Sequence, residues 1–157
     1  MKALVAALAA AVALVVVAVA SAAGKPPIVA QPLGVGQIVG SAQVAKSINL
    51  DLSKPAKVVF VQVKIKPGGD FGWHTHSSAV AVAVVSGTLT LYDSSDVKCA
   101  AHPITAGHGF MESANHIHLA RNEGKTAAKL FVAYLGAPPT KALDSPAAQP
   151  SQCEAVK

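Results

Sequence analysis

The stretch that most constrains the fold of this chain is residues 68–76, Gly-Gly-Asp-Phe-Gly-Trp-His-Thr-His. Successive side chains on a β-strand point to opposite faces, so His74 and His76 project in the same direction when this segment is extended. Two imidazoles on one face can hold the same metal ion. A second pair at the same spacing, His116 and His118, lies downstream. The two pairs together predict a metal site built on β-strands.

The rest of the chain predicts an all-β domain. Apolar and β-branched runs are separated by Gly, Pro and Asp turns about every ten residues, and no sustained helical period is present. The expected strands are residues 47–52, 57–66, 79–85, 88–92, 98–105 and 125–135. Such a series favours an antiparallel double-sheet barrel.

The first histidine segment resembles the first motif of the cupin family, G-x5-H-x-H-x3-E-x6-G. Gly68, His74, His76 and Gly87 occupy the glycine and histidine positions of that motif. Val80 stands where the family carries its acidic ligand. Val80 has the same parity as the two histidines, and on one continuous strand its side chain would approach the metal without binding it.

The second histidine segment resembles the second cupin motif, G-x5-P-x-G-x2-H-x3-N. Gly107, His118 and Asn122 occupy the outer glycine, the histidine and the asparagine of that motif. Ser113 and Asn115 replace the usual proline and inner glycine. Two glycine-anchored motifs in the right order make the resemblance specific.

The resemblance covers residues 58–135 and implies an antiparallel double-stranded β-helix, or jelly-roll barrel. It also implies that His74, His76 and His118 bind a metal, with Val80 leaving the usual carboxylate corner without an acid. Imidazole ligands suit divalent transition metals, here Fe, Zn, Ni, Cu, Co or Mn, better than Mg or Ca.

Two further residues are possible ligands. His116 shares the side-chain direction of His118, although counting from Asn122 selects His118 and leaves His116 to line the pocket. Glu112 is the acid nearest to the second motif. It is either a fourth ligand from a different strand or a carboxylate on the surface.

Other side chains near the motifs are expected to have structural roles. His102 and His108 are interpreted as loop histidines. Arg121 alternates away from His118 and is expected to face solvent, whereas Asn122 is expected to stabilise a turn. The side chains expected in the core are Phe71, Trp73, Phe110 and Phe131.

These residues are compatible with two classes of function. One is a metal-dependent, dioxygenase-like enzyme that acts on a small enolisable or phenolic substrate. The other is a non-catalytic barrel of the cell envelope that binds or senses a small ligand, since no clear general base is present. A closed cavity of drug-like size at the metal would favour the enzyme, and a sealed or flat site would favour binding alone.

The N-terminus predicts export. An apolar run over residues 3–20 follows Lys2 and precedes the small-residue sequence Ala20-Ser21-Ala22, as in a cleaved signal peptide. The protein would then be periplasmic or secreted, with no stable membrane span after cleavage. The alternative is an uncleaved N-terminal anchor.

The expected organisation is a signal peptide at 1–23, an extended N-terminal segment at 24–44, a barrel at 45–136 and a tail at 137–157. The tail is rich in Pro and Ala and is expected to be flexible or strapped on the surface. Cys99 either pairs with Cys153 in a disulfide or is a buried thiol.

The net charge and the resemblance to the cupin family limit which partners can be expected. The net charge is +5 and the basic residues are scattered and not clustered, which argues against a nucleic-acid partner. A small molecule is the expected partner. The cupin resemblance also implies a possible homodimer.

Overall fold

The computed structural model describes residues 28–45, 48–137 and 142–157 of the chain. Within these residues the strands, in chain order, are β1 (Ile28–Ala45), β2 (Ile48–Ile65), β3 (His74–His76), β4 (Ala79–Ser86), β5 (Thr88–Asp93), β6 (His102–Thr105), β7 (Gly109–Glu112), β8 (His118–Arg121), β9 (Ala128–Ala137) and β10 (Asp144–Pro146). One short 3-10 helix, η1 (Ser151–Cys153), follows.

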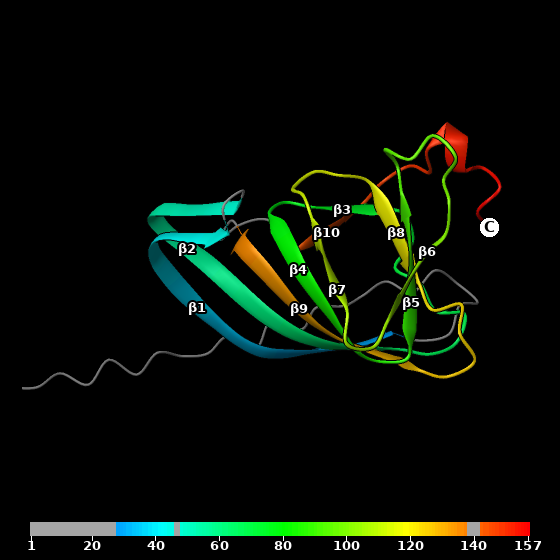
Figure 1. Ribbon diagram of the computed structural model, residues 1–157, viewed down its shortest axis with the longest axis horizontal. Coiled ribbons are helices and arrows are strands. Elements are labelled where there is room, and N and C mark those ends of the chain that lie inside the picture. The colour runs from blue at the N-terminus through cyan, green and yellow to red at the C-terminus, as the bar shows by residue number, and fades with distance from the viewer. Residues whose placement is uncertain (1–27, 46–47, 138–141) are drawn as a thin grey trace, which may run out of the picture.

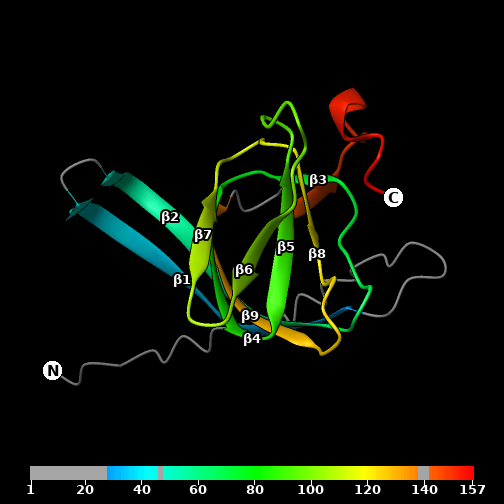
Figure 2. The same ribbon diagram turned by 45° about the vertical axis from the view of Figure 1, so that its right-hand side comes forward.

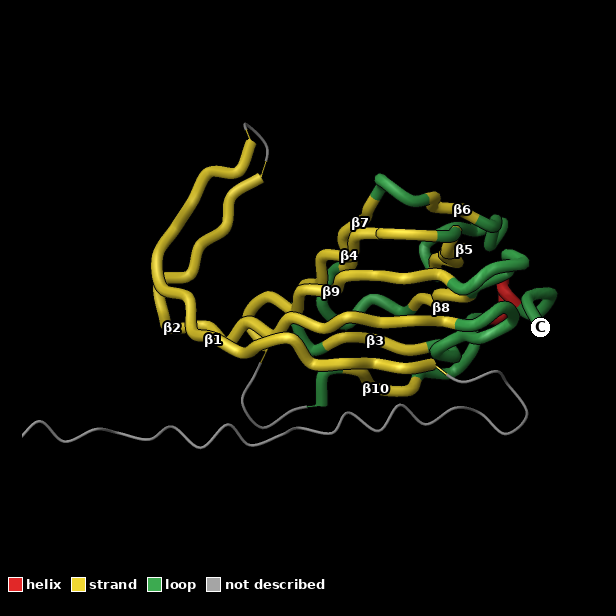
Figure 3. Tube along the Cα trace, turned by 90° about the horizontal axis from the view of Figure 1, so that it is seen from below, coloured by secondary structure: helices red, strands yellow, loops and turns green. Residues whose placement is uncertain are grey.

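The strands form two five-stranded antiparallel sheets. One has the order β1-β2-β9-β4-β7 and the other the order β10-β3-β8-β5-β6. Figures 1 and 2 show the two sheets facing each other, and Figure 3 shows β7 and β6 at one side of the barrel and β10 and β3 at the other. The expectation of an all-β, double-sheet barrel is confirmed.

The core lies between the sheets because β4, β9 and residues 59–65 of β2 alternate along their length. Every second side chain is apolar and buried, and the intervening ones face outward. The main inward-facing residues are Val59, Val61, Val63, Ile65, Val80, Val82, Val84, Leu130, Val132 and Tyr134. Phe131, expected in the core, falls on the outward parity of β9 and is 44% exposed.

The N-terminal part of the fold is a long hairpin. β1 pairs with β2 from Ile28 opposite Ile65 to Ala45 opposite Ile48, with three register shifts. The segment expected only to precede the barrel is therefore a sheet strand over 28–45, and the two strands expected at 47–52 and 57–66 are one strand, β2. In Figure 3 the far end of this hairpin extends beyond the barrel.

The chain changes sheets between β3 and β4. β3 ends at His76, residues 77–78 form a bend, and β4 begins at Ala79 in the opposite sheet. The expectation of one continuous strand from His74 through Val80 is therefore wrong. Val80 is nevertheless fully buried, because β4 has its own alternation.

The backbone of two turns explains which residues occupy two positions of the cupin motifs. Gly87 has a φ of 75°, and a Cβ there would lie 2.8 Å from the carbonyl oxygen of Ala127, so only glycine fits. Asn115, which replaces a family glycine, has a φ of 60°. Asparagine enters this left-handed region more easily than most residues, which explains why the substitution is tolerated.

The C-terminal segment 142–157 is strapped onto the barrel. β10 pairs with β3, η1 follows, and a disulfide joins Cys153 to Cys99. Of the two alternatives for the tail, these contacts support the one strapped on the surface over the flexible one, and the disulfide decides between the two states left open for the cysteines. We call residues 142–157 the C-terminal strap.

The predicted signal peptide at 1–23 lies outside the described residues. Within residues 28–45, 48–137 and 142–157, no helix has the length and apolar character needed to cross a membrane.

Candidate metal centre

Three histidines meet on the inner face of the second sheet. β3 supplies His74 and His76, β8 supplies His118, and His74 lies directly opposite His118 in the register of the two strands. One ring nitrogen from each lies within 4.8 Å of those from the other two, and all three residues are at most 5% exposed. The structure thus brings together the three histidines that the motifs selected.

Hydrogen bonds orient two of these rings. The Nδ1–H of His74 donates to the carbonyl of Gly72 at 2.8 Å, and the Nδ1–H of His118 donates to the carbonyl of His116 at 3.1 Å. Because Nδ1 carries the hydrogen in each case, Nε2 has a free lone pair. Backbone acceptors two residues upstream therefore fix both the tautomer and the orientation of these rings.

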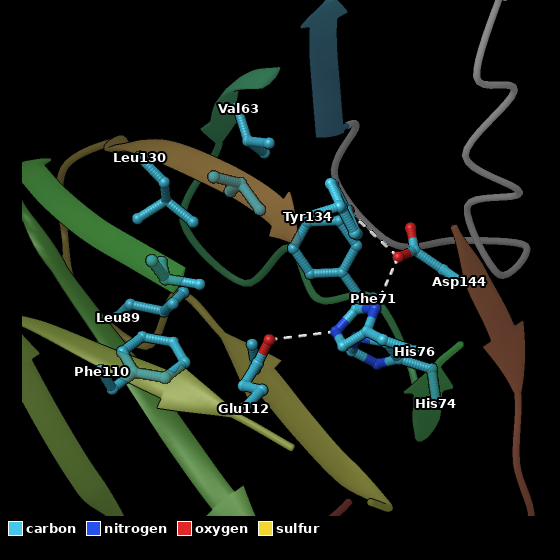
Figure 4. Close-up of a pocket in the computed structure, with 13 residues that line it drawn as sticks. Val63, Phe71, His74, His76, Leu89, Phe110, Glu112, Leu130, Tyr134 and Asp144 are labelled. Carbon is cyan, nitrogen blue, oxygen red and sulfur yellow. Dashed lines mark hydrogen bonds and ion pairs between the residues drawn. The ribbon is translucent and has the colours of Figure 1, made fainter. Parts of the chain in front are cut away.

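The third ring is oriented from the C-terminal strap. The Nδ1 of His76 lies 2.8 Å from Oδ1 of Asp144 and 3.3 Å from the carbonyl of Leu143. The hydroxyl of Tyr134 donates to the same Asp144 oxygen at 3.0 Å. Figure 4 shows Asp144 between His76 and Tyr134.

A buried carboxylate faces the histidines from the other sheet. Glu112 ends β7, directly opposite Val80 of β4. Its Oε2 lies 3.0 Å from Nε2 of His76, and its Oε1 lies 2.8 Å from Nε2 of His118. Glu112 is 8% exposed, so it is not a surface carboxylate. Of the two alternatives left open for Glu112, the structure therefore favours the one near the histidines, and the strand paired with Val80 supplies this acid.

The ionisation of this group follows from its contacts. Burial alone would raise the pKa of Glu112, but the close contacts with His118 and His76 outweigh burial and lower it to about 2. Burial opposes the charged form of His76 as well, but Asp144 and Glu112 outweigh it and raise the pKa to about 9. Burial and the neighbouring His118 lower the pKa of His74 to about 4. The carboxylate is therefore ionised and His74 neutral near pH 7.

Comparisons with known proteins agree with this architecture. Residues 61–134 match the cupin domain family. This match places the chain in the cupin superfamily.

Several solved structures are similar to this cupin. One chain from the crystal structures of the DMSP lyases RdDddP and RnDddQII aligns with a TM-score of 0.50 and 20% identity over 58% of this chain and 44% of its own length. An RmlC-like cupin with a double-stranded β-helix fold from Methanocaldococcus jannaschii aligns with a TM-score of 0.47 and 19% identity over 50% and 70%. Oxalate oxidase with the substrate analogue glycolate aligns with a TM-score of 0.44 and 25% identity over 51% and 42%.

The chain spans less than half of the length of the lyase and oxalate oxidase chains. No curated protein matches it.

The polar atoms of this cupin site fit a metal ion. Nε2 of His118 is buried and makes no hydrogen bond to any described residue, although Oε1 of Glu112 is 2.8 Å away. Two electron-rich atoms at this distance attract one another only through a cation, either a proton or a metal. Three imidazole nitrogens and one carboxylate form a donor set that divalent transition metals bind.

A small cavity adjoins the histidines inside the barrel. Its free volume is about 30 Å³, enough for about two water molecules. His74, His76, Glu112, Tyr134 and Asp144 form its polar end (Figure 4). The apolar wall consists of Val63, Phe71, Val82, Leu89, Phe110, Ala120, Leu130 and Val132. Phe71 and Phe110 thus line the cavity, as well as packing against the core.

The structure places the remaining histidines away from the cluster. Nε2 of His116 lies 2.6 Å from Oδ1 of Asp93, so its ring points out of the site and only its carbonyl serves His118. His116 is therefore not an alternative ligand in this arrangement. His102 and His108 are exposed, on β6 and in the following turn.

Three neighbours of the motifs can now be assigned. Arg121 is mostly buried and forms an ion pair with Asp70 at 3.0 Å, so the expectation that it faces solvent is wrong. Trp73 packs beside the disulfide in a second apolar cluster, as expected of a core residue. Asn122 accepts a hydrogen bond from the N–H of Gly124, which confirms its role in the turn.

Proposed function

We propose that this cupin binds one divalent transition metal through His74, His76, His118 and Glu112. The observation that supports this most directly is the convergence of one ring nitrogen from each of the three histidines and one carboxylate in a buried place. A hydrogen-bond acceptor already holds the other ring nitrogen of each histidine, as is usual for metal ligands.

Glu112 influences which metal is favoured. A carboxylate adds a hard oxygen and one negative charge to three nitrogen donors, which brings Mn(II) and Fe(II) into range beside Zn, Ni, Cu and Co. A bound metal would act as a Lewis acid towards a small ligand or lower the pKa of bound water. The residues of the chain would hold the ion and limit what reaches it.

The size of the cavity favours a binding or sensing role over catalysis on a large substrate. Pockets for drug-sized ligands enclose about 300 Å³ or more. The cavity here, at about 30 Å³, accepts only two or three non-hydrogen atoms, so a phenolic ring would not enter it without displacing side chains. The ligand we propose is a small anion or neutral molecule that reaches the polar end.

A dioxygenase-like activity is the second candidate. The apolar wall favours it, because dioxygen is small and apolar enough to enter the cavity. An organic substrate would then have to approach from the mouth of the site.

We propose that the N-terminal segment directs export of the protein. Outer strands of the barrel would form the contact of a possible homodimer.

Metal analysis tests the proposal. Protein prepared with its native leader should contain about one equivalent of a transition metal, and Mn(II), Fe(II), Co(II) and Zn(II) titrated into chelator-treated protein should each bind at one site. Oxygen uptake by the Fe(II) form with catechol or acetylacetone would separate the two candidates. If none of these ions binds at one equivalent, the proposal is overturned.

A further inference from the structure

We propose that the C-terminal strap is part of the metal site and that Asp144 is a positioning residue for His76. The inference rests on the proposed function, because it assigns Asp144 a role only if His76 is a ligand. Asp144 lies outside both histidine motifs and outside the residues that match the cupin family.

The three histidines differ in where their orienting acceptors come from. His74 and His118 each use a backbone carbonyl two residues earlier, within their own segment. His76 instead relies on Asp144 at 2.8 Å and the more distant carbonyl of Leu143 at 3.3 Å. Both acceptors belong to the strap, so only this ring depends on a distant part of the chain.

The strap is held where this contact requires it. Asp144 and His76 are direct register partners in the β10–β3 pair, and Pro146 lies opposite His74. Leu143 packs against the main core. Further on, Gln152 donates to the carbonyl of Ser94, and the Cys99–Cys153 disulfide is buried. The strap therefore forms the edge of the sheet that carries the histidines.

The chemistry of Asp144 suits this role. A carboxylate that accepts the Nδ1–H of a ligand histidine fixes the tautomer and makes Nε2 a stronger donor than a carbonyl acceptor does. Asp144 is itself held from the other side by the hydroxyl of Tyr134. Its carboxylate thus has a fixed position on one edge of the His76 ring, while Glu112 lies 3.0 Å from the other nitrogen.

The test compares metal affinity in full-length variants with the disulfide intact, using Co(II) as the probe. Asp144→Ala should weaken binding by roughly tenfold to 100-fold, the usual cost of losing such a partner. The Leu143 carbonyl would remain as a weaker acceptor and keeps binding measurable. Asp144→Asn, which keeps an acceptor oxygen without the charge, should fall between Asp144→Ala and the parent.

Ser145→Ala is the matched control, because Ser145 lies on the same strand with an exposed side chain. It should bind Co(II) like the parent protein. The melting temperature of the metal-free proteins and the Co(II) ligand-field spectrum are recorded in parallel. A positioning role changes the affinity and the spectrum in Asp144→Asn without lowering the metal-free melting temperature.

The outcomes separate the two proposals. If His76→Ala binds Co(II) as tightly as the parent, the proposed function fails. If His76→Ala loses binding but both Asp144 variants bind with parental affinity and spectrum, the positioning role alone is overturned. Loss of affinity in Asp144→Ala with full retention in Asp144→Asn would also reject a role for the charge.

Discussion

The two sheets of this cupin contribute to the candidate site in different ways. The β3–β8 pair supplies all three histidines, and each lies inside a short glycine-anchored motif. The opposite sheet supplies Glu112, whose place follows from the pairing of β7 with β4 rather than from any motif. The histidine half of the site is therefore encoded locally, whereas the carboxylate half depends on cross-strand register.

The largest expected effect concerns the histidine sheet. His118→Ala removes a buried metal ligand and should abolish stoichiometric Co(II) binding. This loss is greater than the roughly 100-fold cost of removing a residue that only hydrogen-bonds to a ligand histidine. His102→Ala changes an exposed histidine of the same sheet and should bind normally. Equilibrium titration of both variants measures this difference. Equal binding by the two variants would contradict a site on the histidine sheet.

The second prediction concerns the strap that forms the edge of that sheet. The disulfide closes a loop with a sequence separation of 54, so Cys99→Ser with Cys153→Ser should lower the free energy of unfolding by about 4 kcal/mol in the chain-entropy model. Urea unfolding of the metal-free proteins gives the value. A loss below about 1 kcal/mol would mean that the strand contacts alone hold the strap.

The third prediction concerns the connection between the sheets. The amide of Asn122, beyond the end of β8, donates to the carbonyls of Ile65 and Thr126 and accepts from the N–H of Gly124. Asn122 is fully buried. Asn122→Ala should therefore destabilise the protein by about 3 kcal/mol, because it leaves buried carbonyls without a donor.

Glu123→Gln is the control for Asn122→Ala, because it changes a neighbouring side chain that is 38% exposed. It should cost less than about 1 kcal/mol. Urea unfolding of the two variants gives both values. Equal losses in the two variants would show that Asn122 does no more than a surface turn residue.

The features that the sequence predicted correctly are those with a local signal. The spacing of His74 and His76 sets a shared face within three residues, and this held although the chain changes sheets just after His76. The alternation in 57–66 and 125–135 likewise gave β2 and β9. The same alternation places Phe131 on the outer face of β9. The expectation that Phe131 is buried was therefore wrong, although the pattern itself indicated its exposure.

The features that were missed depend on contacts between distant segments. The bend at 77–78 contains two serines and neither Gly nor Pro, so nothing local marks the change of sheet. The strap is rich in Pro, which argues against regular structure, yet Pro146 is tolerated because β10 is an edge strand. Glu112 had no motif to distinguish it from a surface acid. Only the pairing with Val80 identifies it.

The smallest expected effect tests that pairing directly. Glu112→Val removes one of the four proposed ligands but leaves three histidines, which are enough to hold a metal ion, so Co(II) and Mn(II) binding should weaken by about tenfold or more rather than disappear. Val80 and Glu112 are directly opposite, and cross-strand Cβ atoms lie about 5 Å apart. Adding Val80→Glu should therefore return a carboxylate to the same centre and recover most of the lost affinity, with Mn(II) gaining more than Co(II).

Ala81→Glu combined with Glu112→Val is the matched control for this exchange. Ala81 is the next residue on β4, and its partner Met111 is 62% exposed on the outer face of the sheet. A carboxylate there has the same charge but points away from the histidines, so the affinity should stay low. Equal recovery in both double variants would mean that net charge alone controls metal binding. Recovery only with Val80→Glu would show that either strand of the β4–β7 pair can supply the acid.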